Sequence, residues 1–157
     1  MTIKSVREIN FFQNLRDKEL IFSLCTSKFD RTNEEMFSFI CSVVKIAENE
    51  LTDNETLELK HMEAPSIVSL LKSLEAQKSM NIGNIKLTFM EAIYLHNILD
   101  YFETHYNIFA EYTKVEPKLE YFIQIPAAYY NSIHSIKSHI EFKLGEMVTH
   151  SYKLKHK

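Results

Sequence analysis

The chain has 157 residues, a formal net charge of −3 and only two glycines and three prolines. One core and one domain over residues 1–157 are expected at this length, and the scarcity of turn residues excludes a β-sandwich or barrel and favours an all-α fold. The balanced charge provides no field for nucleic acid, and no apolar run approaches the ~20 residues that cross a bilayer.

The first third of the chain carries two helical patterns and one helix start signal. Apolar residues at helical spacing predict two helices, or one kinked helix, over residues 3–15 and 19–29. Thr32 and Glu35 have the spacing of a capping box, in which each side chain satisfies a free backbone N–H. A helix from Asn33 to about residue 51 should follow and bury an apolar stripe.

The middle of the chain predicts a long helical run that is broken at Gly83. Before this break, apolar residues at helical spacing continue to about Leu74. A kink is expected at Pro65, because proline removes a backbone donor. Gly83 suits the left-handed conformation of a helix C-cap. A second interpretation stays open, in which residues 57–62 form a strand paired with residues 84–87 in an α+β fold.

Two long amphipathic helices are predicted for the last part of the chain. Residues 88–91 form another capping box, opening a helix of roughly seven turns to about Tyr112. Pro117 suits a first helical turn, and Pro126 allows a kink before a stripe that ends near Val148. Both helices are rich in aromatic residues, which most often serve a core or an interface.

The sequence shows no pattern for catalysis or metal binding. Zinc sites need three or four close ligands, and the seven histidines include no HExxH sequence. A GxSxG elbow and a glycine-rich phosphate loop are also absent, so we expect neither an enzyme nor a metal site. Cys25 and Cys41 form no CxxC pair, and the N-terminal residues lack a signal-peptide pattern, so the cytoplasm is the expected compartment.

His96 is the histidine with the best case for a role in binding. It lies beside the apolar face that carries Ala92 and Leu99, and Asp100 one turn on could hold its ring. The plainer interpretation is a histidine at the edge of the core, bonded to a carboxylate. The alternative is a polar anchor for the anionic head group of a ligand.

The apolar positions on both sides of Gly83 follow the pattern of a known family. They read Leu70-Leu71-x-x-Leu74-Glu75-Ala76-Gln77-Lys78-x-Met80 before the break and Leu87-Thr88-Phe89-Met90-Glu91-Ala92-Ile93-x-Leu95 after it. This order resembles the haem-free globin sensor domains of stress-response and sporulation regulators. The stand-alone form is similar to the plasmid-borne sporulation-inhibitory proteins of bacilli.

The resemblance implies an all-α, globin-like fold without haem and a homodimer formed through the last two long helices. It also implies an apolar tunnel that takes a fatty acid, with a halide nearby. The implied activity is inhibition of sporulation signalling, by competition with a homologous sensor histidine kinase for its ligand. The residues leave open an alternative, a helical protein-binding inhibitor or adaptor without a small-molecule ligand.

The sequence is compatible with a lipid site and disfavours haem. A globin needs a proximal histidine before its penultimate long helix, and residues 79–86 contain none. Each buried methylene contributes about 0.8 kcal/mol, so an acyl chain could gain roughly 10 kcal/mol gross with few polar contacts. An apolar cavity between the helices of Ile67 and Phe89 would favour the sensor over the adaptor. The candidate lining residues are Leu70, Leu74, Phe89, Ile93, Leu99, Tyr129 and Ile133, and the head-group candidates are Lys78 and His96.

Overall fold

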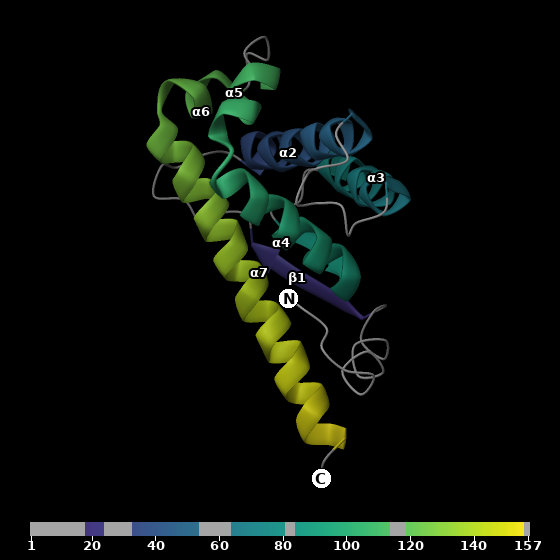
Figure 1. Cartoon of the computed structure of the whole chain (residues 1–157). Coiled ribbons are helices and arrows are strands. Elements are labelled where there is room, and N and C mark those ends of the chain that lie inside the picture. Colours follow the sequence, from purple (N-terminus) through teal and green to yellow (C-terminus); the bar gives the residue numbers. More distant parts are fainter. Residues whose placement is uncertain (1–17, 24–32, 54–63, 81–83, 114–118, 156–157) are drawn as a thin grey trace.

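Helices make up most of the described structure, and two short strands form a small antiparallel sheet (Figure 1). The computed structural model describes residues 18–23, 33–53, 64–80, 84–113 and 119–155. The predicted all-α class is confirmed. The strands are β1 (Glu19–Ser23) and β2 (Asn84–Thr88), and the helices are α2 (Asn33–Asp53), α3 (Ala64–Met80), α4 (Phe89–Glu103), α5 (Tyr106–Thr113), α6 (Glu120–Gln124) and α7 (Pro126–Lys155).

Helix α4 lies between the other long helices. It contacts α2 and α3, which pack against each other, and it also contacts α7 (Figure 1). The apolar faces of these helices and the inward side chains of the sheet join in one buried cluster. Helix α4 therefore gives one face to the core and another to α7.

Helix α2 follows the sequence prediction closely. It begins at Asn33 as expected and ends at Asp53, two residues beyond the predicted end. Its predicted cap residue, Thr32, lies outside the described residues. The apolar stripe is buried, as the helical period requires for a helix packed on one side; its members are Met36, Phe39, Ile40, Val43, Val44 and Ala47.

Residues 19–23 form a strand, so the helix predicted over residues 19–29 is wrong for this part of the segment. Strand β1 pairs with β2 and places Leu20 opposite Leu87. Leu20 is buried and Ile21 is 53% exposed, which is the alternation of a strand with one buried face. Contacts across the sheet and with the core override local helical spacing, because strand formation depends strongly on such contacts.

Strand β2 confirms the strand that was left open for residues 84–87, but its partner is β1. The other proposed partner, residues 57–62, lies outside the described residues. At Lys86, the free edge of β2 is covered by the side chain of Gln77 from α3. The Gln77 Nε2 donates to the Lys86 carbonyl at 2.7 Å, and Oε1 accepts from the Lys86 backbone N–H at 2.7 Å. An amide side chain offers the same donor and acceptor as a peptide group, so Gln77 takes the place of a neighbouring strand here.

The predicted break at Gly83 is present, and a second break divides the helix that was predicted over residues 88–112. Helix α3 ends at Met80 and β2 begins at Asn84, while residues 81–83 lie outside the described residues. The prediction of one seven-turn helix is wrong, because α4 ends before Thr104 and α5 starts two residues later. The Thr104 hydroxyl donates to the Tyr101 carbonyl at 3.3 Å, a local bond that competes with helix continuation.

Two prolines lie at the starts of helices. Pro65 is the second residue of α3, and Pro126 is the first residue of α7. The first turn of a helix tolerates proline because its N–H groups have no partner within the helix. The kinks predicted at these two prolines are therefore wrong, since each of them lies in the first turn of a helix. Helix α7 runs to Lys155, beyond the predicted end near Val148. Even so, no helix in the described part of the chain is long and apolar enough to cross a membrane.

The capping box predicted at residues 88–91 is confirmed, and it sets the start of α4. The Thr88 hydroxyl accepts a hydrogen bond from the Glu91 backbone N–H at 3.2 Å. In return, the Glu91 carboxylate accepts from the Thr88 backbone N–H at 2.9 Å. Two backbone donors are thereby satisfied where β2 turns directly into α4.

Replacing Thr88 with alanine should lower the free energy of unfolding by about 1 kcal/mol, because the Glu91 backbone N–H loses its acceptor. Urea denaturation followed by circular dichroism measures this change. Thr88→Ser is the matched control, since it keeps the hydroxyl. Equal stability of the alanine variant and the wild type would show that the capping box contributes nothing.

Candidate functional site

An aromatic cluster fixes the first turns of α7 to the end of α4. The buried Tyr129 hydroxyl donates to the Phe102 carbonyl at 2.6 Å. Burial raises the pKa of Tyr129, so this hydroxyl stays protonated and remains a donor. The Tyr129 ring lies 4.7 Å from Phe109 and 5.7 Å from Phe39, measured between ring centroids. These contacts join α2, α4, α5 and α7 at one end of the molecule.

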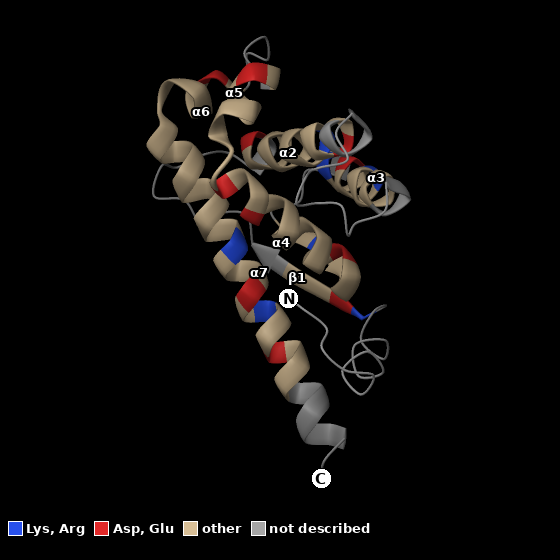
Figure 2. Ribbon diagram, viewed as in Figure 1, with Lys and Arg blue, Asp and Glu red and all other residues tan. Residues whose placement is uncertain are grey.

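A second link between α4 and α7 is ionic. Lys137 of α7 donates to Asp100 at 2.7 Å and to Glu103 at 2.5 Å. Its side chain is only 12% exposed, whereas the two carboxylates reach solvent. Charged positions of both signs follow one another along α7 (Figure 2). The two bonds from Lys137 to α4 place its side chain over the line of contact between α4 and α7, and they hold the middle turns of the two helices together.

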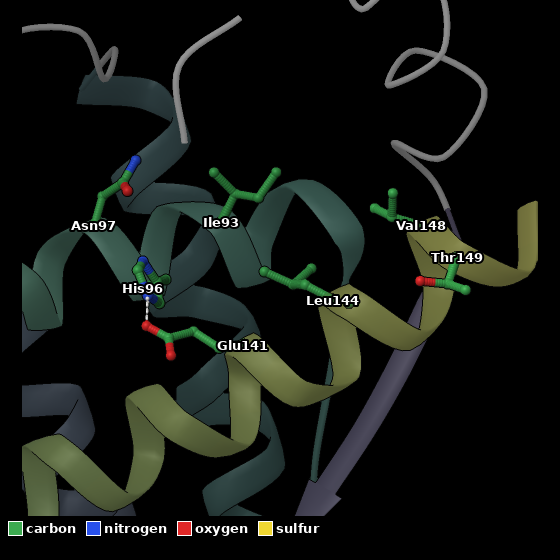
Figure 3. Close-up of a pocket in the computed structure, with 8 residues that line it drawn as sticks. Ile93, His96, Asn97, Glu141, Leu144, Val148 and Thr149 are labelled. Carbon is green, nitrogen blue, oxygen red and sulfur yellow. Dashed lines mark hydrogen bonds and ion pairs between the residues drawn. The ribbon is translucent and has the colours of Figure 1, made fainter. Parts of the chain in front are cut away.

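Further along α7 from these two links, towards its C-terminus, α4 and α7 line an open pocket of about 400 Å³. Its walls come from residues at helical spacing, three on α4 and five on α7, so each helix contributes one edge of its surface. Figure 3 shows His96, Asn97 and Glu141 at one end, Ile93 and Leu144 in the middle, and Val148 and Thr149 at the other end. The full set of lining residues is Ile93, His96, Asn97, Glu141, Leu144, Gly145, Val148 and Thr149.

A histidine and a carboxylate meet at the polar end of the pocket. The Nε2 atom of His96 lies 2.8 Å from Oε1 of Glu141 (Figure 3). The expectation that Asp100 holds the His96 ring is wrong, because the Asp100 carboxylate accepts from Lys137 instead. His96 thus has the plainer role foreseen for it, a histidine at the core edge bonded to a carboxylate, and it lines the pocket as well.

Gly145 leaves space in the wall that α7 provides. A Cβ atom built at this position meets no other atom within 4 Å. Glycine inside a helix costs roughly 0.5–1 kcal/mol relative to alanine. The residue is helical and borders the pocket, so part of the hollow exists because no side chain is present here.

The structure brings two of the nine predicted site residues to this pocket, Ile93 and His96. Lys78 is half-buried on α3, near enough to Cys41 to oppose the rise that burial causes in the pKa of that thiol, and it does not line the pocket. The pocket lies between α4 and α7, whereas the cavity considered from the sequence was between α3 and α4. The remaining six residues are fully buried in the core cluster; they are Leu70, Leu74, Phe89, Leu99, Tyr129 and Ile133.

Most of the residues that α7 contributes to the pocket are not among those predicted from the sequence. Leu144 belongs to the apolar stripe predicted after Pro126, and Glu141, Val148 and Thr149 follow the same helical spacing. Gly145 carried a signal that could have been used, because an isolated glycine inside an amphipathic helix often has a packing or functional reason. The pairing of His96 with Glu141 carried no such signal, since 45 residues separate them.

Within the described residues, no group of three His, Cys, Asp or Glu side chains is arranged to hold a metal ion. The pocket itself offers one imidazole, one carboxylate and one side-chain amide at one end, an aliphatic wall in the middle and the Thr149 hydroxyl at the other end. This set can hold a polar group by hydrogen bonds and an apolar chain by burial. Comparison with known protein families, with curated proteins and with solved structures finds no match.

The ionic link at Lys137 predicts a specific loss of stability in acid. The hydrogen bond from Lys137 holds the pKa of Asp100 below its ordinary value, so the unfolded state binds the proton more readily than the folded state. This contribution is fully present above about pH 4 and is lost as the pH falls through the folded pKa. It is small, under about 1 kcal/mol, because the Asp100 side chain is largely exposed.

We therefore expect Asp100→Asn to be less stable than the wild type at neutral pH and to approach it as the pH falls below about 4. Urea unfolding at a series of pH values measures the difference. Glu75→Gln, an exposed carboxylate on α3, is the matched control. A difference between Asp100→Asn and the wild type that stays constant with pH would contradict the link.

Proposed function

We propose that the chain is a stand-alone sensor domain that binds a single-chain apolar ligand, of the size of a fatty acid, in the pocket between α4 and α7. By taking up this ligand, it inhibits sporulation signalling through competition with a homologous sensor histidine kinase. The observation that supports the binding half is the pocket, which combines an aliphatic wall with a group of polar side chains at the His96 end. The signalling half is supported by the resemblance around Gly83.

The size of the pocket suits a medium-length chain. Its volume of about 400 Å³ lies at the lower end of the range for small-molecule sites. It equals the space of roughly 13 water molecules at about 30 Å³ each, so a ligand of a similar number of heavy atoms would fill it. At about 0.8 kcal/mol for each buried methylene, the tail supplies most of the affinity. Ile93, Leu144 and Val148 provide the surface against which it lies.

The competition mechanism needs no chemistry from this chain. A domain that binds the ligand and is present in excess over it lowers the free concentration that reaches the kinase. In this proposal the protein acts in the cytoplasm, carries no haem and catalyses no reaction. It adopts a globin-like arrangement and forms a homodimer through its last long helices, with a halide as a second ligand.

A phenylalanine at Gly145 should block the pocket. The added Cβ meets open space, so the ring can enter the hollow without displacing the backbone. We expect Gly145→Phe to bind a fluorescent fatty-acyl probe at least about tenfold more weakly than the wild type. Mass spectrometry of an organic extract should also find less lipid in the purified variant.

Two control variants separate blocking from general damage. Gly145→Ala should raise the free energy of unfolding by about 0.5–1 kcal/mol through helix propensity and should still bind the probe. Glu146→Phe places the same ring on the next residue of α7, outside the pocket lining. Probe affinity of Gly145→Phe equal to that of the wild type would refute this pocket as the site, and a wild-type protein that binds no single-chain probe, with a charged or an uncharged head group, would refute ligand binding.

An exposed aromatic residue supports a second candidate function, a helical inhibitor or adaptor that binds another protein. Phe142 on α7 is 65% exposed, and large apolar side chains at such positions are enriched in protein interfaces. If this surface binds a partner, Phe142→Ser should weaken crosslinking to that partner at least about fivefold while probe binding is kept. Unchanged crosslinking of the serine variant would remove Phe142 from the interface.

A further inference from the structure

The polar end of the pocket carries a carboxylate that engages a single described residue. Glu141 bonds through Oε1 to Nε2 of His96 at 2.8 Å, and its side chain is 59% exposed. Among the described residues, the second oxygen, Oε2, has no hydrogen-bond donor. Within the described part of the chain, Glu141 therefore offers an acceptor without a donor and a negative charge at the end of the pocket where a ligand head group would lie (Figure 3).

The imidazole of His96 provides no free cation for an anionic ligand. A bond between Nε2 and a carboxylate oxygen requires the proton on Nε2, so this atom already donates to Glu141. If the ring is protonated, its charge is paired with Glu141 and the two sum to zero. If the ring is neutral, the pair carries one negative charge. In both states a carboxylate head would have to displace Glu141 from His96 or lie against a like charge.

We infer that the ligand of this pocket carries an uncharged head group that donates a hydrogen bond, such as a hydroxyl, and not a carboxylate. This inference rests on the proposed function of the pocket and specifies the class of its ligand. A hydroxyl can donate to Oε2 of Glu141. The side-chain amide of Asn97, which makes no hydrogen bond to a described residue, is a further uncharged polar group in the pocket lining.

Selection against a carboxylate should be measurable with ligands of matched chain length. Like charges a few ångströms apart repel each other in water and more strongly near a protein surface, so we expect wild-type protein to prefer 1-decanol over decanoate by about tenfold. Isothermal titration calorimetry at neutral pH, below the micelle concentration of decanoate and the solubility limit of 1-decanol, gives both values of Kd. Amide NMR spectra show whether the α4 and α7 residues of the pocket respond.

The variant Glu141→Gln tests the cause. It keeps an oxygen that can accept from His96 and removes the charge, so decanoate should bind about tenfold more tightly than to the wild type while the affinity for decanol changes less than about threefold. Glu146→Gln is the matched control, because it removes the same charge from α7 outside the pocket lining. It should leave both affinities unchanged.

The outcomes separate this inference from the proposed function on which it rests. Wild-type protein that binds decanoate as tightly as decanol, with shifts at the pocket residues, overturns the head-group inference and leaves the apolar site intact. Equal effects of Glu141→Gln and Glu146→Gln overturn the assignment to Glu141. Failure of both ligands to bind the wild type overturns the inference and the ligand-binding proposal together.

Discussion

The hydrogen bond from the buried Tyr129 hydroxyl to the Phe102 carbonyl joins α7 to α4 at the point where α4 ends. The Phe102 carbonyl also accepts from the His105 backbone N–H at 3.3 Å, so the Tyr129 hydroxyl gives it a second and shorter hydrogen bond. The Tyr129 ring fills the space between α2, α5 and α7. Helix α7 is one continuous helix, so the position and direction of its first turns at Tyr129 determine how its later turns pack beside α4. The Lys137 bonds then hold the middle of the contact between α4 and α7, and the pocket lies beyond them.

Local signals in the sequence were sufficient for the starts of α2 and α4 and for their buried faces. In the capping box, the side chains of Thr88 and Glu91 each bond to the other residue's backbone, so three residues of spacing contain the whole motif. The strand at Glu19–Ser23 could not be found in this way, because its partner lies more than 60 residues away. The stop before Thr104 depends on a short polar interruption of an otherwise regular apolar period. Such an interruption does not distinguish a break from an exposed turn of a continuous helix.

The candidate site was harder to predict than the core for a physical reason. Apolar spacing identifies side chains that avoid water, and Leu70, Leu74 and Phe89 do so by filling the core. A pocket is instead a place where filling is incomplete, and its signal here is an absent side chain at Gly145. Its polar end joins His96 to a glutamate on another helix, and only the three-dimensional path of α7 brings the two together. The two predicted residues that do line the pocket lie on the face of α4 that turns towards α7.

The amide of Gln77 has a consequence for how this small sheet behaves towards other chains. A two-stranded sheet has two open edges, and an open edge can recruit a strand from another molecule and so begin aggregation. At Lys86, both backbone groups that such a strand would use are already occupied by one side chain from α3. The outward charges of Lys86 and Glu19, 3.0 Å apart, lie on the exposed face of the same sheet. Strand exchange at this edge would first have to break both Gln77 bonds, so a helix side chain acts here as a guard against misassembly.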